Sequence, residues 1–396
     1  MYLGKSLHLC TFLAPLVLAA HVQAADKPSR GTLVSATPIA QLSEEQLDET
    51  YAAKNLEADN GVVIYRVVYE TQTPAEEPIQ ASGLILVPTT GATHFPWISL
   101  QHGTLTGKGE APSLKSAEGI YEASQGFVTV VPDYIGYGNS AQVLHPYLLP
   151  KGYVDATIDL LRAARSFAAS QKISLDAFFL KGYSEGGYAT FVLQKELETK
   201  YASEFPLTAS SPSAGPYNLE ALAQGSFSAP SQSAFATAFI IFSMQKWANN
   251  ALDLSQIFSA DLKELESLLT IDLLTPELLE PKPSDQVLKP AFIADFLTPV
   301  PTTEQALLLR GLFAQANLMR DTWVPQTPTR FYHCPEDEIV NVAFTQQMVE
   351  HLRQLDANAP VSSQYEVSAD SAKPYTHVTC PLYYSAASWF KEILAK

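Results

Sequence analysis

The stretch Ala177-Phe-Phe-Leu-Lys-Gly-Tyr-Ser-Glu-Gly-Gly-Tyr188 predicts a short apolar strand, a tight turn and the start of a helix. The turn carries the pattern Gly-x-Ser-x-Gly, with Ser184 at its centre between Gly182 and Gly186. Glycine on both sides lets the strand and helix backbones approach closely, which leaves the serine hydroxyl exposed at the turn. The strand before it and the helix after it distinguish this nucleophile elbow from an ordinary Gly/Ser turn.

The composition is that of a globular chain, whose 396 residues can bury a large core. Hydrophobic residues make up 46% and charged residues 17%, and the formal net charge is -16. Nucleic acids and anionic membranes bind surfaces with clustered positive charge, so we expect no partner of either kind. One enlarged α/β domain or two domains would both fit this length.

The first 24 residues have the features of a cleavable export signal. Lys5 supplies a positive charge, residues 7–20 are mostly apolar, and Val22-Gln-Ala24 is a small-residue cleavage pattern. The apolar run is shorter than a spanning helix needs, and an uncleaved anchor is the alternative. We therefore expect a secreted or periplasmic protein, without stable membrane insertion once the signal is removed.

After the signal, strand-like segments alternate with helix-like segments. Residues 25–60 are expected to hold one helix, in which Ser43 and Gln46 fit a capping box. The amphipathic pattern of 153–169 predicts a longer helix. The expected strands are 62–69, 79–87, 97–101, 127–131, 177–181, 207–211, 329–333 and 364–367. This alternation predicts an α/β fold with a mostly parallel, eight-stranded sheet flanked by helices.

Residues 216–325 interrupt the alternation. They contain no convincing strand, but helical patterns at 234–247, 262–269 and 304–319 are separated by prolines. We expect this insertion to cover the carboxyl edge of the sheet as a helical cap, and a helical domain remote from the chemistry is the alternative. The expected boundaries are 1–24 for the signal peptide, 25–215 for the first part of the core, 216–325 for the cap and 326–396 for the second part of the core.

A serine nucleophile needs a histidine as base and a carboxylate that orients this histidine. In a sheet of this kind the acid and the histidine follow the serine, in loops after late strands. After 329–333, Asp337 is favoured over Glu336 and Glu338 because it stands three residues before Val340, where the next helix is expected to begin. The competing carboxylates stay open as alternatives.

His377 follows the last expected strand and is the candidate base, with a surface loop histidine as the alternative. The oxyanion of an acyl-transfer intermediate needs preorganised donors. The backbone N–H groups of Glu185 and Thr104 are expected to supply them, because the first follows the nucleophile and the second follows the third strand. Gly103 would permit the close approach of this loop.

Two cysteines remain once the signal is removed, in a compartment where a disulfide can persist. Cys334 lies three residues before Asp337, and Cys380 lies three residues after His377. If both loops converge on Ser184, the two thiols are close enough to form a bridge. Two inert, buried cysteines are the alternative.

Six segments carry a family resemblance: 65–71 (YRVVYET), 81–88 (ASGLILVP), 101–104 (QHGT), 131–138 (VPDYIGYG), 182–187 (GYSEGG) and 213–217 (SAGPY). With them the chain resembles the α/β-hydrolase superfamily and, more narrowly, the secretory lipase family of fungal secreted lipases and their bacterial relatives. The likeness spans about 31–396 and is specific in the first half, whereas the cap matches only in position and helical character. It implies an ester hydrolase with a lid between the sixth and seventh strands and with Ser184, Asp337 and His377 as catalytic triad.

The leading functional hypothesis is a secreted serine carboxylesterase or lipase that acts on a small-molecule or lipid ester through an acyl-enzyme. A peptidase, an amidase or an acyltransferase of the same fold would use the same three residues. A catalytically inactive ligand-binding module is the alternative from another class. No metal or organic cofactor is implied, and no Cys/His spacing resembles a zinc site.

Overall fold

The computed structural model describes residues 29–52, 56–115, 118–228, 234–248, 252–259, 284–369, 372–382 and 385–396. The expected signal peptide (1–24) and the expected helix 262–269 lie outside these described residues.

The described strands and helices follow the alternation expected from the sequence. The strands are β1 (Leu33–Leu42), β2 (Val62–Gln72), β3 (Pro78–Pro88), β4 (His94–Gln101), β5 (Val128–Pro132), β6 (Ser174–Tyr183), β7 (Leu207–Ser213), β8 (Thr329–His333) and β9 (Val361–Tyr365). The α-helices are α1 (Glu44–Tyr51), α2 (Pro112–Lys115), α3 (Ile120–Ser124), α4 (Pro150–Ser170), α5 (Glu185–Lys200), α6 (Leu219–Ser228), α7 (Ala234–Trp247), α8 (Leu254–Ile257), α11 (Ser284–Val287), α12 (Pro290–Leu297), α13 (Glu304–Ala316), α14 (Ala343–Leu355) and α15 (Ala386–Leu394).

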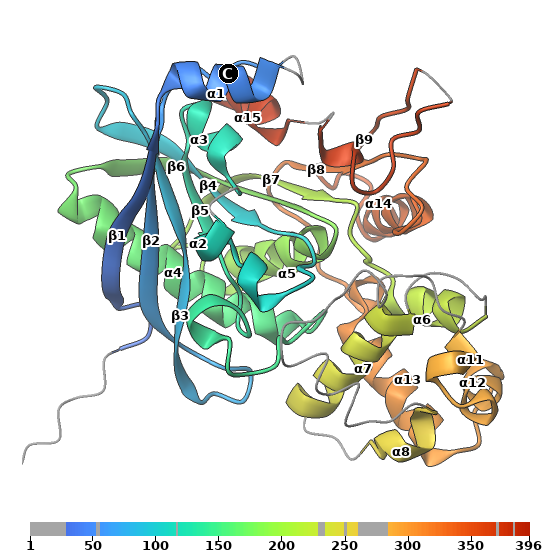
Figure 1. The fold of residues 1–396 in the computed structure, drawn as a ribbon. Helices are drawn as coiled ribbons and strands as arrows, with labels where there is room; N and C mark the ends of the chain where they lie inside the picture. The colour runs from blue at the N-terminus through green and yellow to red at the C-terminus, as the bar shows by residue number, and fades with distance from the viewer. Residues whose placement is uncertain are drawn as a thin grey trace, which may run out of the picture.

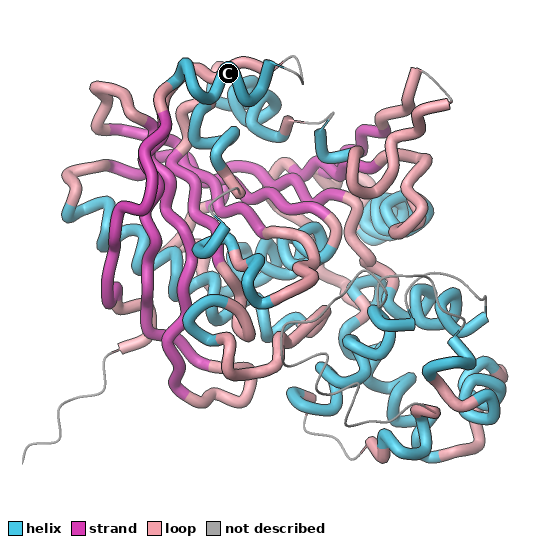
Figure 2. Tube along the Cα trace, viewed as in Figure 1, coloured by secondary structure: helices cyan, strands magenta, loops and turns pink. Residues whose placement is uncertain are grey.

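These strands form a single sheet in the order β1-β2-β3-β5-β4-β6-β7-β8-β9, which is drawn in magenta in Figure 2. The pairs from β1 to β5 in this order are antiparallel. Every following pair, from β5-β4 to β8-β9, is parallel. The expected α/β fold with a mostly parallel sheet is therefore confirmed.

The sheet has nine described strands rather than the eight expected, because β1 was not predicted. This edge strand pairs with β2 only, and each of its residues is half-buried or exposed. Without a buried face its sequence lacks the apolar alternation that marks a strand. It also contains Pro38, which an edge strand tolerates, and the register shifts between Pro38 and Ala40.

Helices cover both faces of the sheet (Figure 1), and alternate side chains of β6 contribute to apolar cores on the two faces. Phe178 and Leu180 of β6 belong to the core packed under α4 and α5. Phe179, between them, belongs to the opposite core, to which α1, α3 and α15 contribute. Because successive side chains of β6 pack into opposite cores, this strand is fixed on both faces, and the elbow follows at its end.

The predicted capping box is confirmed in atomic detail. In the capping box of α1, the Ser43 hydroxyl accepts the Gln46 N–H at 3.2 Å and the Gln46 side chain accepts the Ser43 N–H at 2.9 Å. The hairpin between β2 and β3 closes through a turn in which the Thr73 N–H donates to the Glu77 carbonyl at 2.9 Å.

The described helices between β7 and β8 gather in a separate group beside the sheet (Figure 1). Besides these helices, the described part of 216–325 contains one isolated β-bridge, between Phe258 and Leu288. The Trp247 indole N–H donates to the Leu144 carbonyl at 2.9 Å and so ties α7 to the core. Among the described residues, no helix has the length and apolar character to cross a membrane.

Candidate active site

Ser184 occupies the turn between β6 and α5 in a strained backbone conformation. Its φ of 60° and ψ of -125° are unusual for a residue with a side chain and cost about 1–3 kcal/mol. The Ser184 N–H donates to the Ser213 carbonyl at the end of β7 (3.0 Å), and the Ser184 carbonyl accepts the Gly187 N–H (2.8 Å). Tertiary contacts therefore hold the strained turn.

Glycine is required on both sides of this serine. A Cβ added to Gly182 would lie 2.2 Å from the Gly186 carbonyl oxygen. A Cβ added to Gly186 would lie 2.0 Å from the carbonyl oxygen of Gln101 at the end of β4. Both neighbours are backbone atoms that cannot rotate away, so a larger residue would separate α5 from the sheet.

Loops from two other strands bring a histidine and a carboxylate to Ser184. The Nε2 atom of His377, in the loop after β9, lies 2.8 Å from the Ser184 Oγ. The Nδ1 atom of the same ring lies 2.6 Å from Oδ2 of Asp337, in the loop after β8. Of the other two carboxylates considered from the sequence, Glu338 accepts the His377 backbone N–H at 2.9 Å, and Glu336 has a buried Oε2 without a partner among the described residues.

The Asp337 carboxylate is fully buried (0% side-chain exposure) and takes part in several hydrogen bonds. Its Oδ1 accepts the backbone N–H groups of Ile339 (3.0 Å) and Val340 (2.8 Å). Burial by itself would raise the pKa of this carboxyl, but hydrogen bonds from His333 and His377 outweigh it and hold the pKa well below its ordinary value. Asp337 is therefore ionised at neutral pH and can orient the imidazole of His377.

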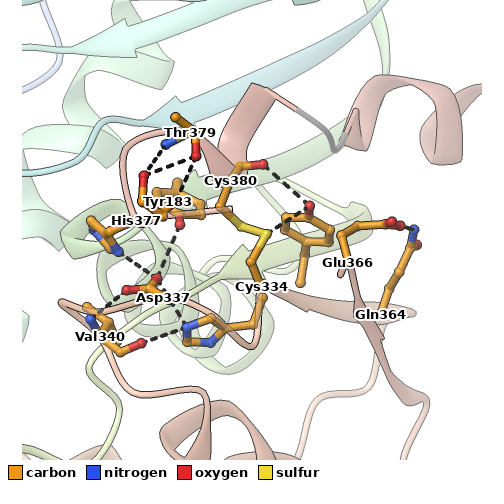
Figure 3. Close-up of a disulfide and its surroundings, with 12 residues drawn as sticks. Tyr183, Cys334, Asp337, Val340, Gln364, Glu366, His377, Thr379 and Cys380 are labelled. Atoms are coloured by element: carbon orange, nitrogen blue, oxygen red, sulfur yellow. Dashed lines mark hydrogen bonds and ion pairs between the residues drawn. A yellow bond between two sulfur atoms is a disulfide. The ribbon is translucent and has the colours of Figure 1, made fainter. Parts of the chain in front are cut away.

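The predicted disulfide between Cys334 and Cys380 is present, with a Cα–Cα distance of 5.9 Å. Both cysteines are fully buried. Figure 3 shows the bridge beside Asp337 and His377, joining the loops that carry them. The bridge therefore limits how far these two loops can separate.

The residues expected to hold an oxyanion also lie next to Ser184. A Cβ added to Gly103 would lie 3.6 Å from the Ser184 Cβ, which shows how closely the loop after β4 approaches the elbow. Among the residues that the structure describes, the backbone N–H groups of Thr104 and Glu185 donate to no protein acceptor. The ring of His102 is buried and engages the Gly103 carbonyl at 2.7 Å, which is a structural contact.

A buried polar network behind the elbow was not anticipated from the sequence. The Glu185 side chain is 1% exposed, and its Oε1 lies 2.7 Å from His145 Nε2 and accepts from the Tyr153 hydroxyl at 2.9 Å. The Tyr147 hydroxyl lies 2.8 Å from the Thr104 hydroxyl. One segment, 145–153, thus contacts both residues whose amides are expected to hold the oxyanion. No local pattern marks it, because its partners lie 32 to 43 positions away.

The helical insertion touches this same segment. The ring of Phe239 in α7 stacks on Tyr147, with centroids 4.7 Å apart and an interplanar angle of 11°. A second α7 residue, Trp247, bonds the Leu144 carbonyl. A single residue, Tyr147, therefore connects the insertion to the Thr104 hydroxyl.

The strand order, the serine elbow and the order of the three residues along the chain define an α/β-hydrolase. The family model for secretory lipases matches residues 120–354, and the chain belongs to this family. It is an ester hydrolase of the lipase/esterase class.

Solved structures agree with this assignment. The ligand-bound rice cell wall degrading esterase LipA from Xanthomonas oryzae is 27% identical with a TM-score of 0.80, and the match covers 93% of this chain and 98% of that one. A putative hydrolase from Legionella pneumophila is 23% identical with a TM-score of 0.80, covering 91% and 98%. Candida antarctica lipase A in its closed state shares the fold at 16% identity, with a TM-score of 0.58 and coverage of 89% and 79%. A search of the curated proteins found no match.

Proposed function

We propose that the chain hydrolyses carboxylic esters with Ser184 as nucleophile, His377 as general base and Asp337 as the residue that orients the histidine. One observation carries this proposal: the Ser184 Oγ, the two ring nitrogens of His377 and the Asp337 carboxylate form a continuous line of hydrogen bonds of 2.8 and 2.6 Å. These distances are within the reach that general-base activation of a hydroxyl requires.

The reaction would proceed in two halves. As the Ser184 oxygen attacks the ester carbonyl carbon, its proton moves to Nε2 of His377 and the carbonyl oxygen becomes an oxyanion. The Thr104 and Glu185 amides stabilise this charge. The bond to the alcohol oxygen then breaks, and the leaving alcohol takes the proton from His377. Water attacks the resulting acyl-enzyme with His377 again as base, which releases the acid and restores Ser184.

We propose that residues 216–325 form a cap that contributes to the substrate site, with 25–215 and 326–396 as the two parts of the core. The stacking of Phe239 on Tyr147, whose hydroxyl contacts Thr104, supports this role. The cap would then bound the space next to the oxyanion donors. It would therefore set which acyl chains are accepted.

We further propose that the chain is exported and that residues 1–24 are removed. The basic and apolar pattern around Lys5, the membership of the secretory lipase family and the buried disulfide support export.

The decisive experiment compares the wild-type protein with Ser184→Ala on p-nitrophenyl esters from acetate to palmitate. We expect kcat to fall roughly 10⁶-fold in the variant, and the preferred chain length to distinguish an esterase from a lipase. A fluorophosphonate probe should label the wild-type protein on the peptide that contains Ser184 and leave the variant unlabelled. Turnover that persists in a folded Ser184→Ala protein, or a label on another residue, would contradict the assignment.

A further inference from the structure

His333, the last residue of β8, is completely buried beside the proposed acid and has no role in the reaction described so far. Its Nε2 lies 2.8 Å from the Val340 carbonyl oxygen and 3.3 Å from Oδ2 of Asp337. Its Nδ1 lies 2.8 Å from the hydroxyl of Thr345, in the first turn of α14. Both ring nitrogens therefore have partners inside the protein.

The partners determine which nitrogen carries a proton. A backbone carbonyl only accepts, so Nε2 of His333 must donate, and its N–H is shared between Val340 and the Asp337 carboxylate. In the neutral ring Nδ1 is then an acceptor, and the Thr345 hydroxyl can donate to it. Thr345 is also fully buried, so this arrangement is shielded from water.

We propose that His333 is a positioning residue for ester hydrolysis. The Val340 carbonyl fixes its tautomer and the Thr345 hydroxyl orients its ring, so that an N–H is directed at the carboxylate that orients His377. This inference rests on the proposed catalytic role of Asp337. The bridging oxygen Oδ2 of Asp337 lies 2.6 Å from His377 and 3.3 Å from His333, so the two imidazoles share one carboxylate oxygen. In the reaction, His333 limits rotation of this carboxylate and moderates the negative charge that His377 experiences.

Other groups also face this centre and stay in place in the variants proposed below. The Tyr183 hydroxyl lies 3.3 Å from Oδ2 of Asp337, and the Glu338 carboxylate holds the His377 backbone N–H. Burial, followed by the charge of Asp337, raises the pKa of Tyr183, so this hydroxyl stays protonated. A change in the pH profile of a His333 variant can therefore be assigned to His333 and not to the ionisation of Tyr183.

His333→Phe tests the role of the Nε2–H donor, because a planar aromatic ring is kept at this position and the N–H is lost. A carboxylate that has lost one donor attracts the protonated His377 more strongly, so the imidazolium persists to higher pH. The acid limb of the kcat/KM profile, which reports protonation of the essential base, should move upward in pH. At the pH optimum kcat should fall about tenfold, the loss expected for one hydrogen bond to a charged group. His333→Gln, whose amide nitrogen can take the place of Nε2, should recover most of both effects.

A matched pair at Thr345 keeps the proposal testable if His333→Phe fails to fold. Thr345→Val keeps the shape of the side chain but removes the hydroxyl that orients His333, and should move the acid limb in the same direction. Thr345→Ser retains the hydroxyl and should behave like the wild-type protein. Circular dichroism and thermal unfolding establish that each variant is folded.

Each outcome separates this inference from the proposed function. If His333→Phe and Thr345→Val lower kcat but leave the acid limb unmoved, and the glutamine variant is no better than phenylalanine, His333 is only structural and the inference is wrong. If Ser184→Ala stays active, the proposed function itself fails. An inactive Ser184→Ala protein together with a shifted acid limb in the His333 and Thr345 variants supports both.

Discussion

Reducing the disulfide should both destabilise the protein and slow its reaction. The bridge joins Cys334 and Cys380 across a sequence separation of 46 and connects the loops that carry Asp337 and His377. It therefore constrains the unfolded chain and, in the folded state, the separation between the proposed acid and base. A disulfide that did not join these two loops would affect stability alone.

The magnitude follows from the length of the closed loop. For a separation of 46, the chain-entropy relation gives about 13.5 cal/mol/K, or about 4 kcal/mol at 25 °C. An unfolding entropy of about 2.1 cal/mol/K per residue gives about 0.8 kcal/mol/K for 396 residues. The midpoint of thermal unfolding should therefore fall by about 5 °C on reduction.

The assay compares oxidised and reduced wild-type protein by calorimetry and by ester hydrolysis, with the thiols counted by mass spectrometry. The reduced protein should unfold at the lower temperature and show a smaller kcat. The double variant C334S/C380S is the matched control, because the same reductant should leave its unfolding and its turnover unchanged. A fully reduced wild-type protein that keeps both its midpoint and its kcat would refute the reasoning.

Two further substitutions test the elbow and its neighbourhood. Tyr147→Phe removes the hydroxyl that lies 2.8 Å from Thr104, so kcat should fall several-fold with little change in the unfolding midpoint; an unchanged kcat would show that this contact does not position Thr104. Gly186→Ala places a Cβ 2.0 Å from the Gln101 carbonyl oxygen and should destabilise the fold by about 3 kcal/mol or more, measured by urea unfolding. The control Gly225→Ala, where nothing lies within 4 Å of the added Cβ, should be neutral or stabilise the protein by up to about 1 kcal/mol.

Much of the architecture could be predicted because the signals are local. The period-2 alternation of β6, the glycines around Ser184 and the capping box at Ser43 each involve residues a few positions apart, whose backbone preferences act before any tertiary contact forms. Each of the eight expected strands overlaps a strand of the sheet, although the last was expected at 364–367 and lies at Val361–Tyr365. The edge strand β1 was missed because it has no buried face, and only its pairing with β2 makes it a strand.

The amino-acid sequence by itself determined the elbow, the candidate serine and the succession of strands and helices, because these depend on short-range sterics and on hydrophobic periodicity. Only the tertiary structure decided which of three neighbouring carboxylates faces the imidazole, and that His333 shares this carboxylate. His377 meets Ser184 across 193 positions and Asp337 across 40. Contacts between residues so far apart in the sequence depend on how the parallel strands place their loops side by side at one edge of the sheet. No local pattern encodes this geometry.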